Sequence, residues 1–154
     1  MTVFGRATLM TGLVTIVAAQ VIAAQTPAVR LVELTGNDLM KYSVTAIAAK
    51  PGELLHVRLK NVGTLPKVAM AHNFVLLALG TDATAFVNAA TPARATDFIP
   101  PAMKDKVIAH TPLAGLNETV EVTFDAPKAP GAYTYLCSFP GHFLAGMKGT
   151  LTVK

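Results

Sequence analysis

The feature that most restricts how this chain can fold is a short run near its C-terminus, residues 137–147, with the sequence CSFPGHFLAGM. Cys137, His142 and Met147 follow one another there at five-residue intervals, and a further candidate ligand, His72, lies far upstream in the sequence MAHNF. One thiolate, two imidazoles and one thioether are the ligand set of a mononuclear blue-copper site, in which the thioether is a long axial ligand. A fold that uses these residues together must bring His72 to the C-terminal loop.

The alternative is that these residues are unrelated: a buried free cysteine, a capping histidine and a core methionine. A lone cysteine often behaves as a small hydrophobic residue. The regular spacing, the Pro-Gly pair within the loop and the separate His-Asn pair favour a metal site. Soft sulfur ligands favour Cu(I), and imidazole suits both oxidation states. The sequence therefore predicts one copper ion that changes between Cu(I) and Cu(II).

The N-terminal residues 1–24 are typical of a secretory signal peptide. Arg6 supplies one positive charge, residues 7–24 are mostly apolar and uncharged, and Ala23 or Ala24 offers a small residue for cleavage. An uncleaved membrane anchor remains an alternative, because about 18 apolar residues can just span a bilayer. We therefore expect a periplasmic or otherwise extracytoplasmic protein, with membrane contact only if the segment is retained.

Residues 25–154 are of a length that suits one domain with its own core. The whole chain has a formal net charge of +4, with its charged residues scattered singly. This pattern predicts neither a nucleic-acid groove nor a polybasic membrane patch. The single cysteine cannot form an internal disulfide, and metal ligation explains an unpaired thiol in an exported protein.

Short apolar segments separated by turn residues predict an all-β fold, a Greek-key antiparallel β-sandwich. The expected strands are residues 29–34, 41–46, 55–60, 74–79, 118–124, 133–137 and 149–153. Between the fourth and fifth of these, residues 82–90 have helical composition with Thr81 or Asp82 as the N-cap. Pro92, Pro100 and Pro101 then interrupt the chain. We expect residues 81–105 to form a short helical flap inserted into the sandwich, with a plain surface loop as the alternative.

The chain resembles a cupredoxin of the azurin and auracyanin group, from about residue 32 to residue 154. Five motifs carry this resemblance besides the C-terminal loop; they are Gly36-Asn37-Asp38, Leu65-Pro66-Lys67, Met70-Ala71-His72-Asn73, Val107-Ile108-Ala109-His110-Thr111 and Met147-Lys148-Gly149-Thr150-Leu151. The spacing of five residues between His142 and Met147 is one longer than in azurins and is more similar to that of auracyanin. The resemblance implies a cupredoxin fold and copper ligation by His72, Cys137, His142 and Met147.

The resemblance also implies roles for residues around the copper ligands. The carbonyl of Ala71 would lie on the axial side opposite Met147. Asn73 would tie the loop that carries His72 to the loop that carries Cys137, and the amides of Asn73 and Phe139 would donate to the cysteine sulfur. Azurins usually carry a disulfide at the positions that correspond to Arg30 and Gly52. The sandwich here must therefore be held together by packing and by copper.

An apolar docking face around His142 is a further implication of the resemblance, since exposed apolar patches often mark contact sites. Its predicted members are Met40, Leu65, Met70, Phe139, Pro140 and either Phe143 or Leu144. The alternative is that several of these residues belong to the core. The two remaining histidines, His56 and His110, are expected at the surface with no metal role.

We therefore predict an extracytoplasmic one-electron carrier whose partners are redox proteins such as cytochromes or membrane complexes. An enzyme is not expected, because four ligands leave no open position for a substrate. A copper oxidase or nitrite reductase would need histidine ligands for a second centre, and a thiolate-bridged binuclear site would need two cysteines. The second hypothesis is a periplasmic copper storage or delivery protein, which would bind Cu(I) without exchanging electrons.

Overall fold

The computed structural model describes residues 1–2 and 28–154, so residues 3–24 of the predicted signal peptide lie outside the described residues. Within the described part, no helix is long and apolar enough to cross a bilayer. The strands are β1 (Arg30–Gly36), β2 (Ala46–Ala49), β3 (Leu54–Asn61), β4 (Val75–Leu77), β5 (Val107–His110), β6 (Thr119–Asp125), β7 (Gly131–Leu136) and β8 (Lys148–Val153). The helices are α1 (Ala83–Ala90) and two short 3-10 helices, η1 (Arg94–Thr96) and η2 (Pro101–Lys106).

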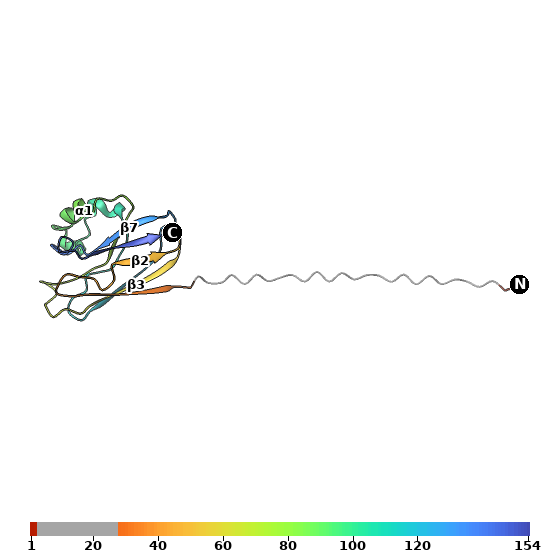
Figure 1. Cartoon of the computed structure of the whole chain (residues 1–154), viewed down its shortest axis with the longest axis horizontal. Helices are drawn as coiled ribbons and strands as arrows, with labels where there is room; N and C mark the ends of the chain where they lie inside the picture. Colours follow the sequence, from red (N-terminus) through yellow and green to blue (C-terminus); the bar gives the residue numbers. More distant parts are fainter. Residues whose placement is uncertain (3–27) are drawn as a thin grey trace.

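The strands form two sheets that pack face to face, and α1 lies outside the larger sheet (Figure 1). The smaller sheet has the strand order β1-β3-β6, and the larger has the order β2-β8-β7-β4-β5. The predicted β-sandwich with a helical insertion is confirmed. The pairing is not purely antiparallel, however, because β1 pairs with β3 and β2 pairs with β8 in parallel. The chain crosses to the other sheet between β1 and β3, so β3 returns in the same direction as β1.

The central strand β4 contributes side chains to two hydrophobic clusters, one on each face of the larger sheet. Side chains on a strand alternate between the two faces of the sheet. Leu76 packs into the core between the sheets, whereas Val75 and Leu77 pack into a second cluster that also contains Phe86 of α1. This explains the continuous apolar run at residues 74–79, since both faces of β4 are covered.

Two strands differ from the sequence prediction. Residues 41–46 were expected to form a strand, but the second strand begins only at Ala46, and Tyr42 forms an isolated bridge with Gly36. The apolar alternation there reflects the burial of the Tyr42 side chain in the main hydrophobic core, and not a ladder of backbone hydrogen bonds. In addition, β5 pairs with β4 at the edge of the larger sheet and was not expected as a strand.

The helical flap is confirmed. Asp82 caps α1, because its carboxylate accepts hydrogen bonds from the amides of Thr84 and Ala85 at 2.9 and 3.1 Å. After α1, η1 and η2 carry the chain back to β5. The inserted segment covers the outer face of β4 and β7 and completes the second hydrophobic cluster.

An ion pair lies where azurins usually have their disulfide. The Arg30 Nε donates to the Glu53 carboxylate at 2.6 Å, and its Nη2 donates to the Ala48 carbonyl at 2.6 Å. These contacts join the start of β1 to β2 and to the turn between β2 and β3. The pair is partly exposed, so it stabilises the fold by about 1 kcal/mol at most.

Candidate metal centre

The loop that follows β7 is closed by its own backbone. The Cys137 amide donates to the Met147 carbonyl at 3.1 Å, and the Met147 amide donates to the His142 carbonyl at 2.9 Å. Within the loop, the His142 amide donates to the Phe139 carbonyl at 3.1 Å. Gly141 has a φ of 84°, a left-handed conformation that favours glycine. These hydrogen bonds fold the loop so that Cys137, His142 and Met147, which are five residues apart in the sequence, lie close together.

His72 is held from the other side by a neighbouring connection. It lies in the segment between β3 and β4, and its backbone exchanges two hydrogen bonds with Ala114, at 3.0 and 2.7 Å. The buried Asn61 side chain donates to the Ala114 carbonyl at 3.2 Å. The histidine is therefore fixed by two long-range contacts, and its ring faces the C-terminal loop.

The three strongest predicted ligands meet in a buried cluster. One ligand atom from each of His72, Cys137 and His142 lies within 4.8 Å of the other two. The two Nδ1 atoms are 3.2 Å apart, and the Cys137 Sγ lies 3.4 Å from the His142 Nδ1. Exposed fractions of the residues are 0% for His72 and Cys137 and 2% for His142.

This arrangement fits a metal ion. Nitrogen and sulfur ligands bind first-row metals at about 2.0–2.3 Å, so ligand atoms about 3.2–3.5 Å apart can share one ion. Two imidazoles and one thiolate also match the donor set of a blue-copper plane. Without a metal, the hydrogen bonds of these buried ligand atoms would run among themselves and to the Ala71 carbonyl.

Comparison with known proteins agrees with this geometry. The profile of the copper binding proteins of the plastocyanin/azurin family matches residues 28–154. The chain belongs to the plastocyanin/azurin family. His72, Cys137 and His142 are therefore arranged as the type 1 site of this copper-binding family, and the site holds one copper ion.

Relatives within the family include azurins and auracyanins. The chain is 43% identical to an azurin from Pseudomonas denitrificans over 129 residues, covering 80% of this chain and 97% of that protein. It is 37% identical to auracyanin-B from Chloroflexus aurantiacus over 130 residues, covering 84% of this chain but only 54% of that longer protein. The crystal structure of dithionite-reduced auracyanin from Roseiflexus castenholzii superposes with a TM-score of 0.72 at 32% identity, covering 80% of this chain and 96% of that one.

Burial controls the protonation of the ligands in this cupredoxin. It is the main cause that lowers the pKa of His72 and of His142 to about 4, and the charge of His72 contributes to the shift of His142. Burial raises the pKa of the Cys137 thiol to about 12, although the backbone amides of Asn73 and Phe139 oppose that shift. At neutral pH the His72 and His142 rings are therefore neutral, which is the form that binds metals. The Cys137 thiol still carries its proton at this pH, so copper must displace that proton when it binds.

The depressed histidine pKa values predict that the metal-free protein loses stability in mild acid. Unfolded histidines titrate near 6.5, so below that pH the unfolded chain binds more protons than the folded one. We expect the free energy of unfolding to fall as the pH is lowered from about 6.5 to about 4, by on the order of 2 kcal/mol per histidine. Urea unfolding at a series of pH values measures this.

The interval between pH 6.5 and pH 5 isolates the histidine effect, because the carboxylates that gain hydrogen bonds on folding titrate at lower pH. A His110→Gln variant, which removes an exposed histidine outside the ligand cluster, is the control. A stability that is constant over this interval would contradict the burial of two neutral ligand rings.

The axial candidates also lie beside the cluster. Met147 is fully buried, and the Ala71 carbonyl lies 3.9 Å from the Cys137 Sγ. A Cβ atom added to Gly36 would lie 2.7 Å from the His72 ring and 2.8 Å from the Met147 Cε. Only glycine therefore allows β1 to approach the site this closely. The side chains of His72 and Met147 both lie against Gly36.

Asn73 connects the two loops that carry the ligands. Its Oδ1 accepts from the Ser138 amide at 2.9 Å, and its Nδ2 donates to the Ser138 Oγ at 2.9 Å. The same Nδ2 donates to the carbonyl of Asp97 at 3.1 Å. The structure thus places Asn73 between the His72 loop, the Cys137 loop and the helical flap.

The predicted docking residues separate into two groups. Leu65, Pro140 and Leu144 are exposed and Met40 is half-buried, so these four can contribute to a surface. Phe143 is only 9% exposed and packs with Phe86 and Leu136 under the flap, so of the two alternatives Leu144, and not Phe143, lies at the surface. Met70 is equally buried and is also removed from that face. His56 pairs with Glu121 on the smaller sheet and is not part of the ligand cluster.

Residues near the site that sequence reasoning did not assign a role are Gly36, Asp38, Asp97 and Ser138. The Asp38 carboxylate accepts from the amide and hydroxyl of Thr64 at 2.7 and 2.8 Å, which lowers its pKa, and its charge acts on His72. For Gly36 and Asp38, the available signal was the Gly-Asn-Asp motif that contributes to the family resemblance. Asp97 gave no signal, because its role lies in a backbone carbonyl.

Proposed function

We propose that this protein is a one-electron carrier in which a copper ion at His72, Cys137 and His142 alternates between Cu(I) and Cu(II). The observation that carries the proposal is the burial of all three ligands within a packed frame. Copper supplies the redox chemistry, and the frame limits how far the ligands move when the charge of the ion changes. Little reorganisation favours rapid electron exchange over the exchange of ligands.

The surrounding residues support a carrier rather than an enzyme. We propose that Met147 would complete the ligand set and that the Ala71 carbonyl would make a further weak contact, while Asn73 and the Phe139 amide would hold the thiolate in place. Support comes from the burial of Met147. Its methyl group and the His72 ring also both lie against Gly36 of β1. A cluster closed in this way gives a substrate no access to the metal.

The proposed location is outside the cytoplasm, in the periplasm or its equivalent. The support is the sequence of residues 1–24, an apolar segment that ends in small residues. Electron donors and acceptors would then be redox proteins such as cytochromes or membrane complexes.

Loading the protein with one equivalent of copper tests the function directly. We expect an intense visible absorption from thiolate-to-Cu(II) charge transfer, which a reductant bleaches and an oxidant restores with one electron per copper. Stopped-flow mixing with a reduced c-type cytochrome should restore or bleach the same band. A colourless protein that surrenders Cu(I) to a copper chaperone would contradict the proposal and support copper storage or delivery.

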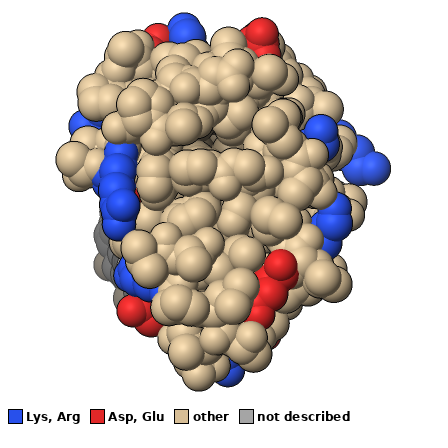
Figure 2. Space-filling model, turned by 90° about the vertical axis from the view of Figure 1, so that its left-hand side faces the viewer, with Lys and Arg blue, Asp and Glu red and all other residues tan. Residues whose placement is uncertain are grey.

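Partners would dock at the end of the sandwich that carries the C-terminal loop. This end lies opposite the C-terminus, and Figure 2 shows that charged side chains lie mainly at the edges of the face. The exposed apolar residues Leu65, Pro140 and Leu144 come from two loops at this end. A broad uncharged surface of this kind suits a short-lived contact with another protein.

Leu144, which is 74% exposed, offers a test of this face. Burying a leucine contributes about 1.5–3 kcal/mol, so a Leu144→Lys substitution should slow electron exchange with the cytochrome about tenfold or more. The visible spectrum should not change, because the ligands are untouched. Leu79→Lys is the matched control, since Leu79 is 54% exposed and contacts Gly131 at the far end of β7. Equal rates for both variants would place the docking face elsewhere.

A further inference from the structure

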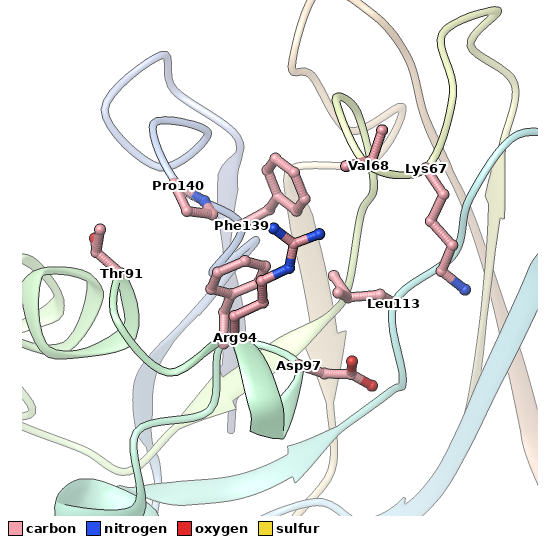
Figure 3. Close-up of a pocket in the computed structure, with 9 residues that line it drawn as sticks. Lys67, Val68, Thr91, Arg94, Asp97, Leu113, Phe139 and Pro140 are labelled. Atoms are coloured by element: carbon pink, nitrogen blue, oxygen red, sulfur yellow. The ribbon is translucent and has the colours of Figure 1, made fainter.

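An open cavity of about 690 Å³ lies beside the loop that carries the copper ligands (Figure 3). Its walls come from the segment before His72, from the flap after α1, from the segment after β5 and from the C-terminal loop. The lining residues are Lys67, Val68, Thr91, Arg94, Asp97, Phe98, Leu113, Phe139 and Pro140. Because Pro140 also belongs to the proposed docking face, the cavity opens at the border of that face.

The cavity is connected to a copper ligand by contacts between aromatic rings. The ring centroids of His142 and Phe139 are 4.7 Å apart, and those of Phe139 and Phe98 are 5.2 Å apart in an edge-to-face arrangement. Both phenylalanines line the cavity. A group held against Phe139 would therefore be separated from the copper ligand His142 by only one aromatic side chain.

The wall that carries Phe98 is held in a strained backbone conformation. Asp97 and Phe98 have φ values of 51° and 59°, a left-handed region that costs a bulky residue such as phenylalanine about 1–2 kcal/mol. The Phe98 amide donates to the Ala93 carbonyl at 3.0 Å, and the Asp97 carbonyl accepts from Asn73 at 3.1 Å. The surrounding contacts thus keep Phe98 against Phe139 at an energetic cost.

The charges around the cavity leave one guanidinium available. Lys67 is paired with Glu118 at 2.7 Å, whereas Arg94 forms no ion pair with the described residues. Figure 3 shows the Arg94 guanidinium directed toward Phe139, and the Asp97 carboxylate directed away from it, toward the side of Leu113. An arginine with free donors above an aromatic surface suits a carboxylate, which it can bind through two parallel hydrogen bonds.

We propose that this cavity docks an acidic side chain, an aspartate or glutamate flanked by an apolar residue, from the protein that exchanges electrons with this one. The carboxylate would bind Arg94, and the apolar neighbour would contact Val68 and Leu113. The contact would place the partner over the Phe98–Phe139–His142 rings and beside the apolar docking face. This inference rests on the proposed electron-carrier function for its kinetic consequence but not for the binding itself.

The test compares Arg94→Gln with Lys128→Gln, which removes the same charge from an exposed residue in the connection between β6 and β7, at the opposite end of the sandwich. Rates are measured by stopped flow against an acidic and a basic c-type cytochrome. We expect Arg94→Gln to slow exchange with the acidic cytochrome about tenfold, and to leave exchange with the basic one within about twofold. Lys128→Gln should change neither rate by more than about twofold.

Equal slowing by the two substitutions would show a general charge effect and would overturn the proposal, as would unchanged rates for Arg94→Gln. Binding is measured separately by NMR, with this protein and the acidic cytochrome both reduced so that no electron moves. Shifts at the Phe98 and Phe139 rings that occur in the unaltered protein, together with a shift at the Arg94 Nε, and that disappear from both rings in Arg94→Gln support docking even if exchange itself is absent. Shifts caused by free benzoate but not by the cytochrome would assign the cavity to a small aromatic acid and overturn the proposal.

Discussion

A Cys137→Ser variant loaded with copper is expected to lack the intense visible band entirely. The band requires charge transfer from a thiolate to Cu(II), and this chain has no second cysteine that could supply one. The serine oxygen is also a harder donor, so affinity for Cu(I) should fall. Visible absorption at one copper per protein, with copper content measured in parallel, gives the result.

Met147→Leu is the matched control for this experiment. It also removes a sulfur beside the site, but the thiolate plane remains, so the band should persist. The reduction potential should rise, because a weak donor to the oxidised ion is lost. Retained colour in Cys137→Ser would overturn the assignment of the thiolate, and an unchanged potential in Met147→Leu would place that sulfur away from the metal.

Removal of copper is expected to lower the melting temperature by about 15 °C. A ligand that binds only the native state at about a thousand times its Kd stabilises it by about 4 kcal/mol, and each kcal/mol shifts the melting temperature of a domain of this size by about 4 °C. No disulfide supports the fold, and the Arg30–Glu53 ion pair is partly exposed. Calorimetry of the copper-loaded and metal-free forms measures the difference.

The Cys137→Ser variant supplies the control for the melting experiment as well. Copper should raise its melting temperature far less than that of the unaltered protein, because the strongest ligand is absent. Equal melting temperatures for the loaded and metal-free forms of the unaltered protein would contradict a preformed site that binds copper only in the native state.

The sequence predicted the position of a strand correctly where one face of the strand is exposed to solvent. Leu55, Val57 and Leu59 alternate with polar residues, and all three are buried on β3. Tyr42 was misread because its burial comes from a contact with Tyr135 on another strand, at 5.8 Å between ring centroids. Alternation reports which side chains are buried, but not whether the backbone around them joins a ladder.

The alternation of apolar and polar residues could not predict whether two strands pair in parallel or antiparallel. The residues of β1 and β3 would alternate in the same manner in a parallel or an antiparallel pair. The route of the chain decides the direction, because β2 crosses to the other sheet before β3 begins. That route depends on contacts between residues far apart in sequence.

The sequence by itself determined the chemistry of the site, because donor atoms belong to residue types and the spacing of Cys137, His142 and Met147 is local. It also determined the number of thiolates available, since there is one cysteine. Tertiary structure alone decided that Phe143 is buried while its neighbour Leu144 is exposed. It likewise placed Asp97 against Asn73 and left Arg94 beside Phe139. Those outcomes depend on how the flap packs over β4 and β7, and such long-range packing leaves no local pattern in the chain.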